Sequence, residues 1–173
     1  MHPGMDGRIV GEGIFRLRRR VAIATMRTVH THRMRLAAGT IYYRALGAGP
    51  PLALLHGLSG SGRWWRRNVA ALAQHYQVYL VDLLGFGRSR GQPFVLSQAA
   101  RALAEWLDAM RLEQISVIGH SMGGYIAIDL AANYPERIRR MVLVDALALP
   151  MDRSVLRSAL GLAHALRYMP FNF

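Results

Sequence analysis

The stretch "VIGHSMGGYIAIDLA", Val117 to Ala131, joins an apolar run to a helical pattern and places a serine between two glycines at the junction. The apolar run has the composition of a buried strand, and the residues after Met122 have the apolar spacing of a helix. Gly119, Ser121 and Gly123 match the pattern G-x-S-x-G, in which a strained strand-to-helix turn exposes a serine hydroxyl. Small neighbours let the chain pass through such a turn. The pattern therefore predicts a nucleophile at Ser121.

Other apolar runs and helical patterns flank this stretch on both sides. The near-continuous apolar runs are typical of parallel strands covered on both faces, and they are "PLALLHG", "QVYLVDLLG", "ISVIGH" and "RMVLVDA". Helical patterns lie between them over residues 62–76, over 97–112 with Ser97 as the N-cap, and after Ser121 as far as Pro135. Strands that alternate with helices in this way predict an α/β fold with a mostly parallel sheet.

The two ends of the chain differ from this pattern. The alternating segments 28–36 and 39–46 predict a hairpin at one edge of the sheet. Beyond Ala146 we expect a loop and one amphipathic helix over about 153–167. We therefore expect a basic arm over residues 1–27, a core over 28–150, and a final segment over 151–173.

The composition excludes several classes of protein. The chain has 173 residues, of which 52% are hydrophobic and 18% charged, as in a globular protein rather than a disordered one. It contains no cysteine, which excludes disulfides, a thiolate nucleophile and cysteine-type zinc sites. No apolar run reaches the roughly 18 residues that a membrane-spanning helix needs, and the short run after the first arginines does not form a signal peptide. We expect a cytoplasmic protein.

The positive charge is concentrated near the N-terminus. The net charge is +12 and every basic residue is arginine; the first 35 residues contain eight arginines but only two acidic residues, Asp6 and Glu12. We interpret this segment as a solvated, partly helical arm. Peripheral contact with an anionic membrane is an open alternative. Nucleic-acid binding, which would weaken steeply with salt, is not expected.

Four motifs occur in an order that resembles the α/β-hydrolase superfamily, in particular its single-domain esterase and lipase-like group: "LLHGLSGSGRWW", "VDLLGFGRS", "GHSMGG" and "YPERIRRMVLVDA". The resemblance covers about residues 28–173. It implies an α/β-hydrolase fold and a serine hydrolase acting on a small-molecule ester or related carbonyl substrate, with no cofactor and no metal. It also implies that the loop after His56 supplies an oxyanion donor. The backbone N–H of Leu58 would then act together with that of Met122.

The segment "DLLGFGRSRG" has a second interpretation as a phosphate-binding loop. Its glycines follow a strand, but the third comes one position late for the G-x-G-x-x-G pattern. The family resemblance instead gives Asp82 and Ser89 a structural role. A nucleotide site therefore remains the lesser alternative.

A serine nucleophile requires a base and an acid, and the sequence contains few candidates for either role. In the α/β-hydrolase fold, which this sequence resembles, the acid follows the serine along the chain and the histidine follows the acid. The histidine that follows Ser121 is His164, whose place in the terminal helical pattern argues against a role as base. Asp145, at the end of "RMVLVDA", is the candidate acid. The alternative, an acid on the next strand as in most of the family, stays open.

These observations lead us to expect a fragment of a longer hydrolase, truncated at the start of the lid region. The strand "RMVLVDA" would then lie at a sheet edge, although its composition is that of a buried strand. We expect the chain alone to be a poor catalyst. The alternative function is a non-catalytic ligand-binding or interaction protein of the same fold, and the sequence specifies no oligomeric state.

Overall fold

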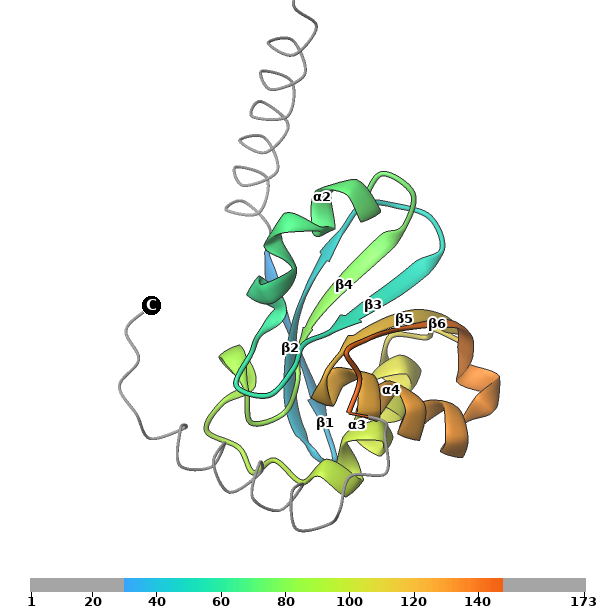
Figure 1. Ribbon diagram of the computed structural model, residues 1–173. Helices are drawn as coiled ribbons and strands as arrows, with labels where there is room; N and C mark the ends of the chain where they lie inside the picture. The colour runs from blue at the N-terminus through green and yellow to red at the C-terminus, as the bar shows by residue number, and fades with distance from the viewer. Residues whose placement is uncertain (1–29, 148–173) are drawn as a thin grey trace, which may run out of the picture.

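The protein is represented by a computed structural model that describes residues 30–147 (Figure 1). In this range six strands form one sheet in the order β1-β2-β4-β3-β5-β6. The arm expected over residues 1–27 and the helix expected over 153–167 lie outside the described residues, so the proposed division of the chain stays a prediction. The strands are β1 Thr31–Leu36, β2 Gly39–Leu46, β3 Pro51–Leu55, β4 Gln77–Asp82, β5 Ile115–His120 and β6 Ile138–Val144.

The first two strands form the predicted hairpin. They pair antiparallel, from Thr31 opposite Arg44 to Leu36 opposite Gly39 at the turn. β2 then pairs antiparallel with β4. β1 is largely exposed, as expected for a sheet edge.

The other strands form the parallel part of the sheet. β4, β3, β5 and β6 are parallel neighbours, and β3 and β4 are almost entirely buried. Because successive side chains of a strand point to opposite faces, burial along the whole strand requires cover on both faces. The predicted α/β fold with a mostly parallel sheet is confirmed.

Helical segments cover the two faces of this sheet (Figure 1). On one face, the long helices α3 and α4 bury Trp106, Leu107 and Ile126 against the strands. On the other face, Trp65 and Val69 pack with Leu80 in a second, smaller core. The helical segments are η1 Gly62–Arg67, α2 Val69–Leu72, η2 Gly87–Ser89, α3 Leu96–Ala109, α4 Met122–Asn133 and η3 Pro135–Arg137. No helix in the described part of the chain is both long and apolar enough to cross a membrane.

Two details of the helices differ from the sequence predictions. The helix expected over 62–76 is divided into a 3-10 segment, η1, and the short helix α2. Apolar spacing over so few residues does not distinguish the two kinds of helix. The prediction of Ser97 as the N-cap of α3 is wrong, because the helix begins at Leu96 after an extended Val95. Leu96 packs against the main core, which favours the earlier start.

β6 forms the second edge of the sheet within residues 30–147. It pairs there with β5 alone. Its side chains are exposed despite their apolar character, with 52% of Val142 and 42% of Leu143 accessible. This part of the fold therefore presents an apolar strand edge of the kind that promotes pairing with another strand.

Candidate active site

Ser121 lies between β5 and α4 with a backbone conformation that is uncommon for a residue with a side chain. Its φ is 51° and its ψ is −116°. The conformation is held by hydrogen bonds: the Ser121 N–H donates to the carbonyl of Val144 at 3.0 Å, and its own carbonyl accepts from Gly124 at 3.0 Å and Tyr125 at 3.1 Å. Strained residues of this kind cost about 1–3 kcal/mol and cluster at functional sites. The geometry is that of the turn predicted from G-x-S-x-G.

The glycines on either side of Ser121 allow α4 to lie close to the strands. A Cβ atom added to Gly119 would lie 2.7 Å from the backbone carbon of Gly123. A Cβ added to Gly123 would meet the carbonyl oxygen of Leu55 and lie 2.7 Å from that of His56. These neighbours are backbone atoms of α4, of β3 and of the loop after β3, so they have little freedom to move. Both positions therefore require glycine for close approach.

Two backbone N–H groups near Ser121 have no hydrogen-bond acceptor within residues 30–147. Met122 is the first residue of α4, and the first N–H groups of a helix have no acceptor within the helix. Leu58 follows Gly57, where an added Cβ would lie only 3.3 Å from the Cβ of Ser121. Within residues 30–147 neither the Leu58 nor the Met122 N–H group has a hydrogen-bond acceptor. The loop and the turn thus bring two unused donors to one end of the sheet.

His56 holds the loop that carries Leu58. The side chain is fully buried, its Nδ1 lies 2.8 Å from the carbonyl oxygen of Gly57, and its Nε2 accepts the N–H of Leu83 at 3.1 Å. The second bond requires an unprotonated Nε2, so the ring is neutral and Nδ1 is its donor. Burial lowers the pKa of His56, opposed by the Gly57 bond and the charge of Asp82. His56 is therefore a bracing residue rather than a free base.

His120 and Trp64 form the surface next to Ser121. Their ring centroids are 5.1 Å apart, and Trp64 is 50% exposed. The Nδ1 atom of His120 is buried, has no hydrogen-bond partner among residues 30–147, and would lie 2.8 Å from a Cβ added to Gly57. Trp65, by contrast, is 7% exposed and belongs to the smaller core. One tryptophan of the pair therefore packs inside while the other is available at the surface.

Asp145 lies at the same edge of the sheet as Ser121. It directly follows β6, where Val144 pairs with His120, and it is exposed with a φ of 45°. The structure gives no side-chain hydrogen bond between Asp145 and the other residues of 30–147, so its role as the acid stays a prediction. His164 lies outside the described residues.

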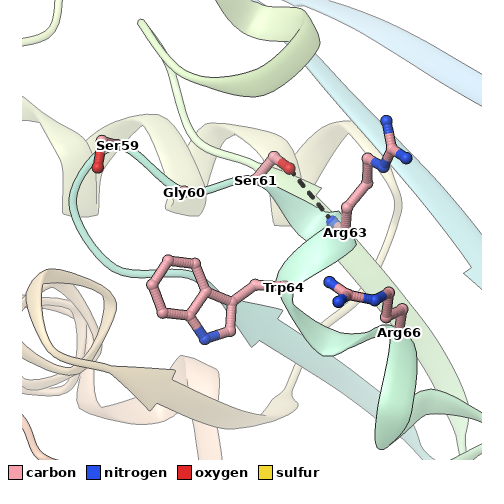
Figure 2. Close-up of a pocket in the computed structure, with 6 residues that line it drawn as sticks. All are labelled: Ser59, Gly60, Ser61, Arg63, Trp64 and Arg66. Carbon is pink, nitrogen blue, oxygen red and sulfur yellow. Dashed lines mark hydrogen bonds between the residues drawn. The ribbon is translucent and has the colours of Figure 1, made fainter. Parts of the chain in front are cut away.

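A cavity of about 310 Å³ lies beside η1 (Figure 2). Its lining is formed by Ser59, Gly60, Ser61, Arg63, Trp64 and Arg66. Ser121 is not part of that lining. The connection between the two is Trp64, which lines the cavity and contacts His120. The sequence does not predict this cavity, although most of its lining residues belong to the motif "LLHGLSGSGRWW", because its shape depends on how the loop before η1 is placed beside that segment.

The loop proposed as an alternative nucleotide site has a different structural role. Asp82 at its start is buried and accepts the N–H of Gly62 at 2.6 Å and that of Arg88 at 2.9 Å. Ser89 is also buried; its hydroxyl donates to the Asp82 carbonyl at 2.7 Å and accepts the N–H of Tyr42 at 3.0 Å. These contacts match the structural role given to Asp82 and Ser89. In the described range no group of His, Asp or Glu is arranged to hold a metal ion.

The sequence matches the family model described as alpha/beta hydrolase fold over residues 50–172. A relative from Azorhizobium caulinodans, named "Putative carbamate hydrolase RutD", is 40% identical over 110 residues, which are 62% of this chain and 42% of that protein. A hydrolase structure from Pseudomonas aeruginosa has a TM-score of 0.70 at 26% identity and covers 77% of this chain and 52% of that one. A marine microorganism esterase structure has a TM-score of 0.64 at 30% identity, with coverages of 75% and 51%. The chain thus spans about half or less of the length of these proteins.

Proposed function

Because the chain belongs to the alpha/beta hydrolase fold family, we propose that it carries the nucleophile and oxyanion donors of a serine hydrolase. The observation that supports this most strongly is the strained backbone of Ser121 beside two N–H groups that have no acceptor in residues 30–147. A structural serine at a strand-to-helix turn gains nothing from that strain. Ser121 is the proposed nucleophile, and Leu58 and Met122 are the proposed donors.

The proposed reaction is acyl transfer from an ester or related carbonyl substrate. The Ser121 oxygen attacks the carbonyl carbon, its proton passes to a base, and the carbonyl oxygen becomes an oxyanion. The N–H groups of Leu58 and Met122 stabilise that charge, each lowering the barrier by about 3 kcal/mol in comparable sites. Loss of the alcohol leaves an acyl-serine, which water then hydrolyses.

We propose that neither His56 nor His120 is the base. His56 uses both ring nitrogens inside the protein, and the Nδ1 atom of His120 is buried behind Gly57. His164 is not assigned, and Asp145 remains the proposed acid. A serine hydroxyl without a base is a weak nucleophile. We therefore expect the 173-residue chain, which we propose to be part of a longer hydrolase, to turn over esters poorly by itself.

The substrate class is supported by the similar proteins. One is named as a carbamate hydrolase and another as an esterase. Both reactions begin at a carbonyl carbon bonded to a heteroatom, which is the chemistry that a serine and two oxyanion donors can perform. We propose a small carbonyl substrate of this kind, with no cofactor.

A fluorophosphonate probe tests the proposal directly, because it reacts with activated serines and its product resembles the tetrahedral intermediate. We expect mass spectrometry to find the probe on Ser121 in the folded chain and no label in Ser121→Ala. Ser116→Ala, on β5 just before Ser121, is the matched control and should be labelled like the unmodified protein. Labelling of other serines at the same rate as Ser121 would contradict the proposal.

A second candidate function is non-catalytic binding with the same fold. It is favoured by the cavity beside η1, whose lining does not include Ser121. Under this alternative a small carbonyl compound would bind reversibly and the probe would leave Ser121 unmodified. We further propose that the basic N-terminal arm makes peripheral contact with anionic membranes, so deletion of residues 1–26 should weaken binding in a vesicle sedimentation assay.

A further inference from the structure

Three arginines from separate segments meet on the face of the sheet that carries η1. Thr31 of β1 lies opposite Arg44 of β2, so the two side chains share one face. The guanidinium of Arg88, from η2, donates a hydrogen bond to the Thr31 hydroxyl. Arg88 and Arg44 are therefore close neighbours, although they are far apart in the sequence.

The third member is Arg63 at the start of η1. Arg44 pairs with Leu80 across β2 and β4, and a Cβ added to Gly62 would lie 3.1 Å from the Leu80 Cβ. Arg63 follows Gly62 directly. Figure 2 shows its side chain leaving η1 in a different direction from that of Trp64. We call Arg44, Arg63 and Arg88 the arginine cluster.

A buried scaffold fixes the arginine cluster. One oxygen of the Asp82 carboxylate accepts the N–H of Gly62 and the other accepts the N–H of Arg88, so this single side chain holds the starts of η1 and η2 together. An added Cβ at Gly87 would lie 2.5 Å from the Asp82 carboxyl carbon, which shows how closely the loop approaches. The cluster is thus built by the fold and does not depend on chance placement of surface side chains.

The charge of the arginine cluster is poorly compensated. Among residues 30–147 the ion pairs are Arg101 with Glu105 and Arg137 with Asp108, so no arginine of the cluster belongs to one. Burial lowers the pKa of Arg44; the charge of Asp82 opposes this shift, and the charges of Arg88 and Arg63 add to it. Three positive charges therefore surround one carboxylate whose oxygens already accept backbone hydrogen bonds.

We propose that the arginine cluster is a binding site for a phosphoryl group, carried by free phosphate or by a lipid headgroup. A phosphoryl group has two negative charges near neutral pH and several acceptor oxygens, and planar guanidinium groups bind such oxygens in pairs. The Thr31 hydroxyl supplies a further polar group. Arg63 also lines the cavity beside η1, so a bound phosphoryl group would lie at the edge of that cavity.

Titration calorimetry of the full chain with inorganic phosphate tests this site without any turnover, so its outcome does not depend on Ser121. We expect phosphate to bind, and Arg63→Gln to weaken binding about tenfold, equivalent to about 1.4 kcal/mol. Arg88→Gln should have a similar effect. Arg139→Gln is the matched control, since it removes the same charge from an exposed position on β6 at the opposite edge of the sheet.

The source of the phosphoryl group is distinguished with phosphatidylcholine vesicles with and without phosphatidic acid. Sedimentation with phosphatidic acid vesicles that Arg63→Gln weakens and Arg139→Gln leaves unchanged, while inorganic phosphate alone does not bind, supports the site and assigns it to a lipid headgroup, because both variants keep the N-terminal arm. Binding of inorganic phosphate together with vesicle binding that Arg63→Gln does not change assigns it to a soluble ligand. The proposal is overturned if neither binds, or if Arg139→Gln weakens binding as much as Arg63→Gln while all variants keep the same melting temperature.

Discussion

Replacing Asp82 with asparagine tests whether one buried carboxylate holds the two loops beside the candidate active site. The carboxylate accepts the N–H of Gly62 at 2.6 Å and that of Arg88 at 2.9 Å, and Asp82 is only 8% exposed. In Asp82→Asn one oxygen can still accept, but the new amide group presents a donor to the second N–H. One charge-assisted hydrogen bond is lost and two donors face each other.

The expected cost of Asp82→Asn follows from these contacts. A hydrogen bond to a charged group contributes about 1.5–3 kcal/mol, so the free energy of unfolding of the variant should be about 2–3 kcal/mol lower than that of the unmodified protein. For a chain of this size the loss corresponds to roughly 5–10 °C in Tm. Asp82→Ala loses both bonds, about 3–6 kcal/mol in total, which approaches the whole stability of a typical domain.

Urea unfolding followed by circular dichroism measures this loss. Asp129→Asn is the control, because Asp129 lies on α4 and its hydrogen bonds are to Asn133 of the same helix. We expect the control to remain within about 0.5 kcal/mol of the unmodified protein. An Asp82→Asn variant that also stays within that limit would refute the assigned role of the carboxylate.

Three further predictions follow from the described contacts. Gly123→Ala places a methyl group against the backbone carbonyls of Leu55 and His56, so it should lower the free energy of unfolding by about 1–3 kcal/mol or more in urea titrations; an unchanged midpoint would contradict this. Burial lowers the pKa of the His56 imidazole in the folded chain, so the unfolded chain binds a proton on this side chain first as the pH falls. The contribution of His56 to the free energy of unfolding is therefore fully present above about pH 6.5 and is lost below it by up to about 1.4 kcal/mol per pH unit. His56→Gln should lack that part of the slope when unfolding is compared at several pH values. Val142→Lys places a charge on the exposed β6 edge and should reduce light scattering on concentration; equal scattering would argue against edge pairing.

The α/β fold class with a mostly parallel sheet was predictable because it depends on which segments are apolar enough to be buried. The strands containing Leu54, Leu80 and Val117 are mostly apolar, and β3 and β4 are buried along almost their whole length. The turn at Ser121 was predictable for a different reason. Its glycines are required by backbone contacts that allow no Cβ, so the requirement is visible directly in the sequence.

The contacts between distant segments were not predictable in the same way. Nothing in the local sequence indicates that Arg44, Arg63 and Arg88 meet, because their proximity depends on strand register and on the two hydrogen bonds of Asp82. The start of α3 was also missed, since packing of Leu96 against the core outweighs the capping preference of Ser97. Tertiary packing decided each of these features.

The most direct test of the proposed function is the rate at which a fluorophosphonate modifies Ser121 in the folded and in the urea-unfolded chain. In comparable sites the loss of one oxyanion donor costs about 10²–10³ in rate, so two preorganised N–H groups should accelerate the reaction at least about a hundredfold on folding, even without an assigned base. Peptide mapping by mass spectrometry gives both rates at this one serine. We predict fast modification of Ser121 that disappears on unfolding. Equal rates in the folded and unfolded chains would contradict the assignment of Ser121 as the nucleophile.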